Sequence, residues 1–177
     1  LLTQKIKQSW MQMKSIKNKL KKIKLVITDV DGVLTNGGLY YSDQGLVMKK
    51  FNVKDGIATR RLRENGLECG IISSDGAEII EARNKRLKMD FLITGIWEKL
   101  DKLKEICEEK NLKFENVAYL GDDINDIGII KKVGFSAAPS DAIDSVLEAV
   151  DYVCKKRGGD GVFREFAELI ISGQNKV

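Results

Sequence analysis

The stretch LVITDVDGVLTNGG, residues 25–38, ends an apolar run with two aspartates, Asp29 and Asp31, that are one residue apart. An apolar, β-branched run of this length predicts a buried strand, and the glycines after it predict a turn. Two carboxylates this close repel each other. A plain acidic turn and a site for a cation or a phosphoryl group therefore both remain open at this point.

On either side of this turn, short apolar runs alternate with helical patterns. Strands are predicted at KLVITDV, LECGIISS, FLITG, NVAYLGD, FSAA and DYVCK, and helices near residues 56–65, 77–88, 97–111, 126–133, 141–149 and 162–172. This alternation predicts an α/β fold, a Rossmann-like, doubly wound parallel sheet with helices on both faces. The segment GLYYSDQGLVMKKFNV has period-two character around a polar turn, which predicts an inserted β-hairpin at residues 38–52.

The charge of the chain is unevenly distributed. Residues 1–24 contain eight of the 30 basic residues and none of the 26 acidic ones, so the remaining residues carry 22 basic and 26 acidic groups. We therefore divide the chain into a basic arm, residues 1–23, and one domain, residues 24–177. Because the first residue is Leu1 and not Met, we expect the natural start to be missing, and a longer parent chain remains open.

The arm has one apolar stripe at helical spacing, formed by Ile6, Trp10, Met13, Ile16, Leu20 and Ile23. A basic amphipathic helix can lie on a membrane or on nucleic acid. Packing on a neighbouring domain or subunit is the commoner use, and we favour it here. No run of 18 apolar residues exists, so we expect no membrane span. Because we favour packing on protein for the arm, we also expect no nucleic-acid partner.

Histidine is absent, which excludes serine–histidine triads and most zinc hydrolases. The three cysteines, Cys69, Cys107 and Cys154, are far apart and lie among apolar neighbours. An odd number of such residues is typical of reduced core thiols. We therefore expect a cytoplasmic protein.

Polar residues gather at the predicted carboxyl ends of the strands, where parallel sheets bind their ligands. They are Asp29, Asp31, Ser73, Ser74, Asp75, Asp122, Asp123 and Asp126, with Lys99 at the start of a helix. Any one of them could be a helix cap or a solvated turn. Together, carboxylates without histidine indicate Mg²⁺, and a hydroxyl and a lysine beside them suit a transferring phosphoryl group.

These residues carry a resemblance to a known family. The segment Asp29-Val30-Asp31-Gly32-Val33-Leu34-Thr35, then Ser73, then Lys99, then Gly121-Asp122-Asp123 with Asp126, resembles the four ordered motifs of haloacid dehalogenase (HAD) superfamily phosphatases. VITDVDGVLTNGGLYY, KKFNVKDG, NVAYLGDDINDI and KKRGGDGVFREF are similar to capless members that dephosphorylate 3-deoxy-2-keto sugar acids. Their substrates are 3-deoxy-D-manno-octulosonate (KDO) 8-phosphate or N-acylneuraminate-type (including KDN) 9-phosphates.

The resemblance implies roles for individual residues. Asp29 would be the nucleophile and Asp31 the general acid and base; Asp29, the backbone carbonyl of Asp31, and Asp122 would hold Mg²⁺. Ser73 and Lys99 would bind the phosphoryl group. Asp123 and Asp126 would support the site from behind the residues that touch the metal and the phosphoryl group, with Asp126 orienting Lys99. Implied substrate contacts are Asn52, Val53, Lys54, Asp55, Gly56, Arg60, Asp75, Arg83 and Arg164. Without the resemblance, each arginine would be read as part of a solvated helix face.

Two features bear on substrate and assembly. The chain leaves no room for a cap domain, so the resemblance implies a homotetramer in which neighbours complete the pocket, helped by the loop at residues 158–161 and Arg164.

Where KDO 8-phosphate phosphatases typically place glycine and a base after the motif serine, this chain has Ser74 and Asp75. The acid favours a nine-carbon substrate slightly over KDO 8-phosphate.

Two other classes of protein remain open. A signalling receiver domain uses similar strand-end acids, but its phospho-accepting aspartate lies mid-chain, whereas here the acidic pair comes first. A phosphatase-like oligomerisation domain of a longer sugar-acid cytidylyltransferase is the other alternative. The complete set of chemical residues argues against it.

Overall fold

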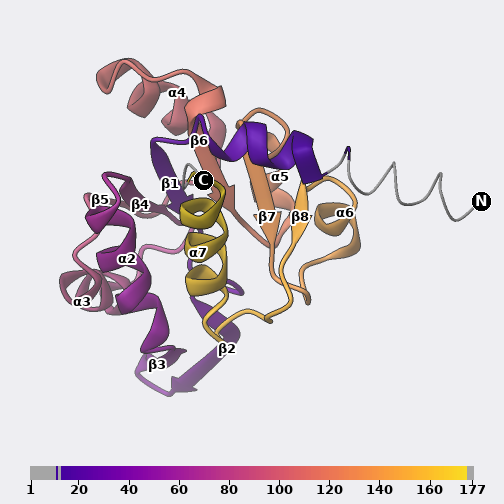
Figure 1. Ribbon diagram of the computed structural model, residues 1–177. Helices are drawn as coiled ribbons and strands as arrows, with labels where there is room; N and C mark the ends of the chain where they lie inside the picture. The colour runs from indigo at the N-terminus through magenta and orange to yellow at the C-terminus, as the bar shows by residue number, and fades with distance from the viewer. Residues whose placement is uncertain (1–10, 12, 175–177) are drawn as a thin grey trace, which may run out of the picture.

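The computed structural model describes residues 11 and 13–174 (Figure 1). A sheet of six parallel strands forms the centre of the domain, in the order β5-β4-β1-β6-β7-β8. The strands are β1 (Leu25–Thr28), β4 (Glu68–Ile72), β5 (Phe91–Ile93), β6 (Val117–Leu120), β7 (Phe135–Ala138) and β8 (Tyr152–Val153). The predicted doubly wound parallel sheet is confirmed.

Helices cover both faces of this sheet, because successive strand residues point to opposite sides. In β1, Val26 belongs to one apolar core and Ile27 to the other. The first core receives side chains from α2 (Lys54–Glu64), α3 (Glu78–Leu87) and α7 (Val162–Gln174); the second receives them from α4 (Lys99–Glu109), α5 (Ile127–Ile130) and α6 (Asp144–Leu147). The three cysteines are free and buried within these cores, as predicted.

Strand β1 is central and wholly buried. Leu25 pairs with Glu68 of β4 on one side and with Val117 of β6 on the other. The residues that follow β1, β4 and β6 therefore meet at one edge of the sheet. This register brings distant acidic segments of the sequence together.

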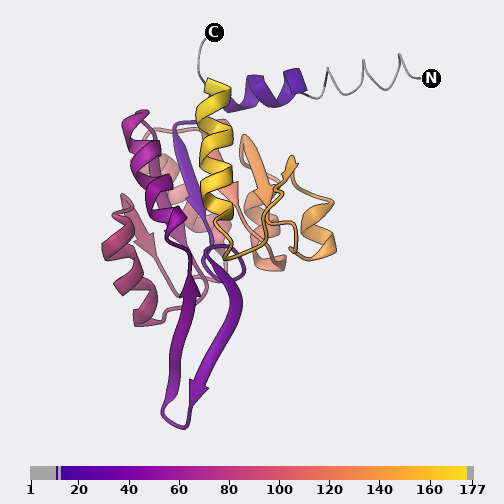
Figure 2. The same ribbon diagram turned by 60° about the horizontal axis from the view of Figure 1, so that its bottom comes forward.

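A two-stranded antiparallel hairpin, β2 (Thr35–Ser42) and β3 (Gly45–Phe51), extends away from the sheet (Figure 2). It turns where the sequence predicted but begins at Thr35, three residues earlier than expected. Between β1 and β4 the chain forms only this hairpin and α2, and between β4 and β5 only α3. The described chain therefore has no cap domain.

Two predicted helices are shorter than expected. The pattern at 126–133 forms a 3-10 turn, η2 (Ile124–Asp126), followed by α5, and the pattern at 141–149 forms only α6. Ile143 is extended, and its N–H donates to the carbonyl of Asp122, so α6 cannot begin earlier. The carboxylate of Asp126, the last residue of η2, accepts the backbone N–H groups of Asp122 and Asp123.

The arm packs on its own domain where the structure describes it. Residues 13–20 are helical, and Leu20 and Ile23 are buried in the first core. The side chain of Gln174, at the end of α7, donates to the carbonyls of Leu20 and Ile23. Ile6 and Trp10 of the predicted stripe lie outside the described residues. None of the helices in the described part of the chain has the length and hydropathy that a membrane span requires.

Candidate active site

The site begins where β1 ends. Asp29 is 5% exposed, and its backbone N–H continues the ladder to Leu120 of β6. One carboxylate oxygen of Asp29 accepts the N–H of Val30 at 2.7 Å. The other lies 2.7 Å from the ammonium of Lys99, the first residue of α4. Asp29 is therefore held in one orientation at the sheet edge.

A buried polar network lies behind Asp29. Asp126 Oδ1 accepts hydrogen bonds from Lys99 at 2.7 Å and from the hydroxyl of Tyr119 at 2.6 Å. Asp126 Oδ2 accepts the N–H groups of Asp122 at 2.8 Å and Asp123 at 3.3 Å. Both oxygens of Asp126 are thus occupied by protein donors. Asp126 orients Lys99 and the backbone after β6.

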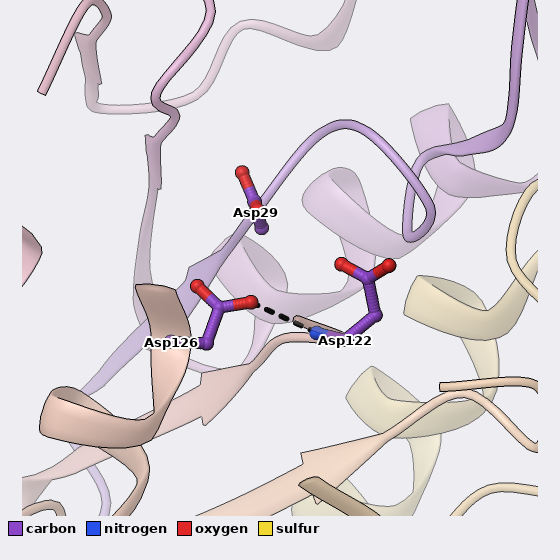
Figure 3. Close-up of side chains that lie close together, drawn as sticks. All are labelled: Asp29, Asp122 and Asp126. Carbon is purple, nitrogen blue, oxygen red and sulfur yellow. Dashed lines mark hydrogen bonds between the residues drawn. The ribbon is translucent and has the colours of Figure 1, made fainter. Parts of the chain in front are cut away.

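Three carboxylates converge at this point. Oxygens of Asp29, Asp122 and Asp126 lie within 4.8 Å of one another (Figure 3). Asp122 Oδ1 is buried and has no hydrogen-bond partner among the residues that the structure describes. Burial and the charges of Asp29 and Asp126 raise the pKa of Asp122 to about 8. Burial and then the charge of Asp126 raise the pKa of Asp29, although Lys99 opposes the shift.

This cluster fits a Mg²⁺ ion. A divalent cation would supply the missing partner of Asp122 and offset the repulsion among the carboxylates. Asp126 is already saturated by protein donors, so Asp29 and Asp122 are the carboxylates free to hold the metal. The side chain of Asp31 contacts Lys49 and Thr35 instead, which leaves its backbone carbonyl as the ligand that the sequence analysis assigned.

A glycine allows the turn after Asp31 to pack on the metal cluster. Gly32 has φ +77°, and a Cβ there would lie 1.9 Å from Asp122 Oδ2. The loop at residues 158–161 packs on the same turn, since the N–H of Gly159 donates to the carbonyl of Val33 at 2.9 Å. That this loop also serves a neighbouring subunit stays a prediction.

The carboxylates open into a cavity of about 220 Å³. Its lining consists of Asp29, Asp31, Ser73, Ser74, Asp75, Trp97, Asp122, Asp123, Ile124 and Asn125. Seven of the polar residues that were predicted to gather at the strand ends, all of them following β1, β4 or β6, therefore line one cavity. Lys99 and Asp126 lie buried behind it, in contact with each other.

The other predicted substrate contacts do not line this cavity in the single chain. Arg60 is exposed and pairs with Glu64, whereas Arg164 pairs with Glu168. Asp55 is buried and accepts the N–H of Arg164. The side chain of Arg83 donates to the backbone carbonyl of Asn52, at the end of the hairpin, and Val53, Lys54 and Gly56 lie beside it at the start of α2.

Sequence reasoning missed five residues of the site: Trp97, Ile124 and Asn125, which line the cavity, and Tyr119 and Lys49, which bond to carboxylates of the site. Trp97 lines the cavity with 63% of its surface exposed. Tyr119 had a signal that could have been used, a polar tip on a buried strand two residues before the Gly-Asp-Asp step. Lys49 had none, because its partners come from other segments of the chain.

Comparisons with known proteins agree with this geometry. The family model described as haloacid dehalogenase-like hydrolase matches residues 89–166. The 3-deoxy-D-manno-octulosonate 8-phosphate phosphatase of Escherichia coli is 37% identical over 159 residues, which are 90% of this chain and 85% of that protein. The chain belongs to the haloacid dehalogenase phosphatases. It is a phosphoric monoester hydrolase, and Mg²⁺ is its cofactor.

Solved structures extend the likeness across the domain of this phosphatase. The enzyme from Moraxella catarrhalis, described in complex with magnesium, phosphate and KDO, superposes with a TM-score of 0.89 at 32% identity, covering 92% of this chain and 94% of that one. The cobalt-bound Haemophilus influenzae enzyme gives a TM-score of 0.84 at 36% identity, covering 88% and 91%.

Proposed function

We propose that this phosphatase hydrolyses KDO 8-phosphate through an aspartyl-phosphate formed on Asp29. One observation carries the proposal. The Asp29 carboxylate lines an open cavity while Lys99 holds it from behind at 2.7 Å and the unpartnered oxygen of Asp122 lies nearby. This arrangement supports a mechanism in which a nucleophile, a buried cation and a metal ligand surround one point where a phosphoryl group can enter.

The reaction needs two steps at this point. In the first, a carboxylate oxygen of Asp29 attacks phosphorus, and Asp31 gives its proton to the sugar oxygen as the phosphorus–oxygen bond breaks. In the second, Asp31 takes a proton from water, which attacks the phosphorus of the aspartyl-phosphate and releases phosphate and Asp29. Ser73 and Lys99 bind the phosphoryl oxygens, and Mg²⁺, when bound, neutralises charge that develops on them.

The choice of substrate rests on the relatives and on Asp75. The matched relatives carry the name of KDO 8-phosphate phosphatase, and the comparisons support neither the nine-carbon substrate, nor a receiver domain, nor an oligomerisation module. In the sequence, Asp75 favoured the nine-carbon sugar because it was taken to be an uncompensated negative charge. Its carboxylate instead accepts a hydrogen bond from the buried ammonium of Lys49. The charge is compensated within the chain, so that argument loses its basis.

The remaining substrate contacts belong to the proposal as well. We place the sugar acid between the cavity and residues 52–56, with Lys54, Arg83 and a neighbour's Arg164 offering positive charge to its carboxylate. Arg60 lies on an exposed helix face and pairs with Glu64, so we expect its contribution to be the smallest. A homotetramer would bring the neighbouring groups close.

The test is phosphate release from KDO 8-phosphate and from an N-acylneuraminate 9-phosphate, measured with Mg²⁺ at equal concentrations. We expect a higher kcat/KM for KDO 8-phosphate. Asp29→Asn should abolish turnover, because phosphate monoester hydrolysis without a catalyst is among the slowest biological reactions. Asp43→Asn, in the exposed hairpin turn, is the matched control and should keep wild-type activity. A preference for the nine-carbon ester would overturn the substrate, and an active Asp29→Asn variant would overturn the mechanism.

A further inference from the structure

Lys49 is the one buried residue of strand β3. Its side chain is 0% exposed, although it belongs to a hairpin whose other side chains are largely in contact with solvent. Lysine is rarely buried without a specific partner, because removing the ammonium from water is costly. The strand pattern alone therefore does not explain why the Lys49 side chain is buried.

The ammonium of Lys49 contacts two carboxylates that line the active-site cavity. It lies 2.6 Å from Asp31 Oδ2, and it also donates to Asp75 Oδ2. Asp31 comes from the turn after β1, and Asp75 from the loop after β4. Lys49 thus joins the hairpin to two separate loops of the site.

Both ends of this bridge are held by further contacts. Asp31 Oδ1 accepts a hydrogen bond from the hydroxyl of Thr35 at 3.3 Å. Asp75 Oδ1 accepts the N–H of Ala77, the residue before α3, at 2.9 Å. With one donor on each oxygen, the plane of the Asp31 carboxylate is fixed.

An anchor for the hairpin would not need a charge. An apolar side chain of similar length could fill the same buried volume, and burying charged groups seldom adds net stability over apolar ones. What an ammonium adds is a directed hydrogen bond to Asp31.

We propose that Lys49 is a positioning residue that holds the carboxylate of Asp31 in line for proton transfer to the leaving oxygen. The inference rests on the role of Asp31 given under the proposed function. Lys49 acts through Asp31, and it is not required to touch the substrate.

The test compares two aryl esters that need the proton to different extents. Nitrophenolate, released from p-nitrophenyl phosphate, is a weak base and leaves without protonation, whereas the more basic phenolate from phenyl phosphate benefits from a general acid. The measured quantity is the ratio of kcat/KM for the two esters in one enzyme sample. Because unfolded protein lowers both values equally, the ratio does not depend on the folded fraction.

In Lys49→Met we expect the ratio to shift at least about tenfold toward p-nitrophenyl phosphate, since well-placed general acids contribute ~10²- to 10⁴-fold. Lys49→Gln should shift the ratio of kcat/KM in the same direction, and it replaces Lys49→Met in the test if the methionine variant does not fold. Lys50→Met is the matched control, because Lys50 is the next residue of the same strand and is exposed. It should keep the wild-type ratio.

Asp31→Asn separates the two possible failures. If Asp31→Asn shifts the ratio and the Lys49 variants do not, the inference about Lys49 is wrong while the proposed mechanism stands. If Asp31→Asn leaves the ratio unchanged, the proton donor itself has been misassigned.

Discussion

The ammonium of Lys99 lies 2.7 Å from Asp29 Oδ2, and neither side chain is more than 7% exposed. Burial alone would lower the pKa of Lys99, but the charges of Asp29 and Asp126 outweigh it and raise the pKa. Lys99 therefore stays charged at neutral pH. It is the buried counter-ion on which the orientation of Asp29 depends.

Replacing Lys99 by methionine should destabilise the protein. The change leaves two buried carboxylates without their cation, and breaking a buried ion pair in this way costs about 3–5 kcal/mol. Chemical denaturation measures the loss. Lys104→Met on the same helix removes an exposed lysine paired with Asp101 and should change stability by less than ~0.5 kcal/mol. Equal effects of the two variants would contradict the buried network.

Gly32→Ala should weaken Mg²⁺ binding. Its Cβ would meet Asp122 Oδ2 at 1.9 Å and push that carboxylate out of place. Gly37→Ala is a matched control, since Gly37 has a similar φ of +74° but no atom within 3.9 Å of the new Cβ. Both variants bear the strain of a positive φ, about 1–2 kcal/mol. Calorimetric titration with Mg²⁺ should therefore show a loss only in Gly32→Ala, and the same affinity in both would refute this packing.

Mg²⁺ affinity should increase as the pH rises from about 6 to about 8.5. Metal binding needs deprotonated carboxylates, and the pKa of Asp122 is raised to about 8 in the metal-free protein, so protons compete with the ion at lower pH. Calorimetry at the two pH values measures the change. Asp122→Asn should weaken binding at both values and flatten the dependence. An affinity that does not vary with pH would argue against a raised pKa.

The same shift fixes the sign of the pH dependence of stability. Between the unfolded pKa of 3.8 and the folded value of about 8, the folded metal-free protein binds more protons at Asp122 than the unfolded chain does. The free energy of unfolding that Asp122 contributes through this difference in proton binding is fully present below pH 3.8 and is lost as the pH rises through about 8. Melting of the metal-free protein should show the loss, and saturating Mg²⁺ should offset it at the higher pH.

The hairpin should mediate self-association. Tyr41 and Val47 are 67% and 61% exposed, and an isolated hairpin is marginally stable in water unless it packs on something else. We expect light scattering to give the mass of a tetramer for the wild type. The double variant Tyr41→Ser, Val47→Ser should have a lower mass and lower activity, while Asp43→Asn should keep the assembly. A wild-type protein that is monomeric and fully active at assay concentration would contradict the proposal that neighbouring subunits complete the substrate pocket.

The sequence predicted the sheet and its acidic edge because both follow from local patterns. A short apolar, β-branched run bounded by turn residues predicts a fully buried strand, and the carboxyl ends of parallel strands lie at the same edge of their sheet. Asp29, Ser73 and Asp122 could thus be assigned to one site before any contact was known. The extents of α5 and α6 could not be predicted, because the segments before them make tertiary contacts that a helical pattern does not report: the Asp126 carboxylate accepts the N–H of Asp122, and the N–H of Ile143 donates to the carbonyl of Asp122.

Only the tertiary structure decided which partners these residues have. Lys49 lies 18 residues from Asp31 and 26 from Asp75, and nothing in its local pattern separates it from the exposed Lys50. The sequence by itself determined that acidic residues would line the carboxyl edge of the sheet. Only the tertiary structure decided that Lys99 faces Asp29 and that Lys49 faces Asp31, because an ion pair forms only where two separate segments meet in space.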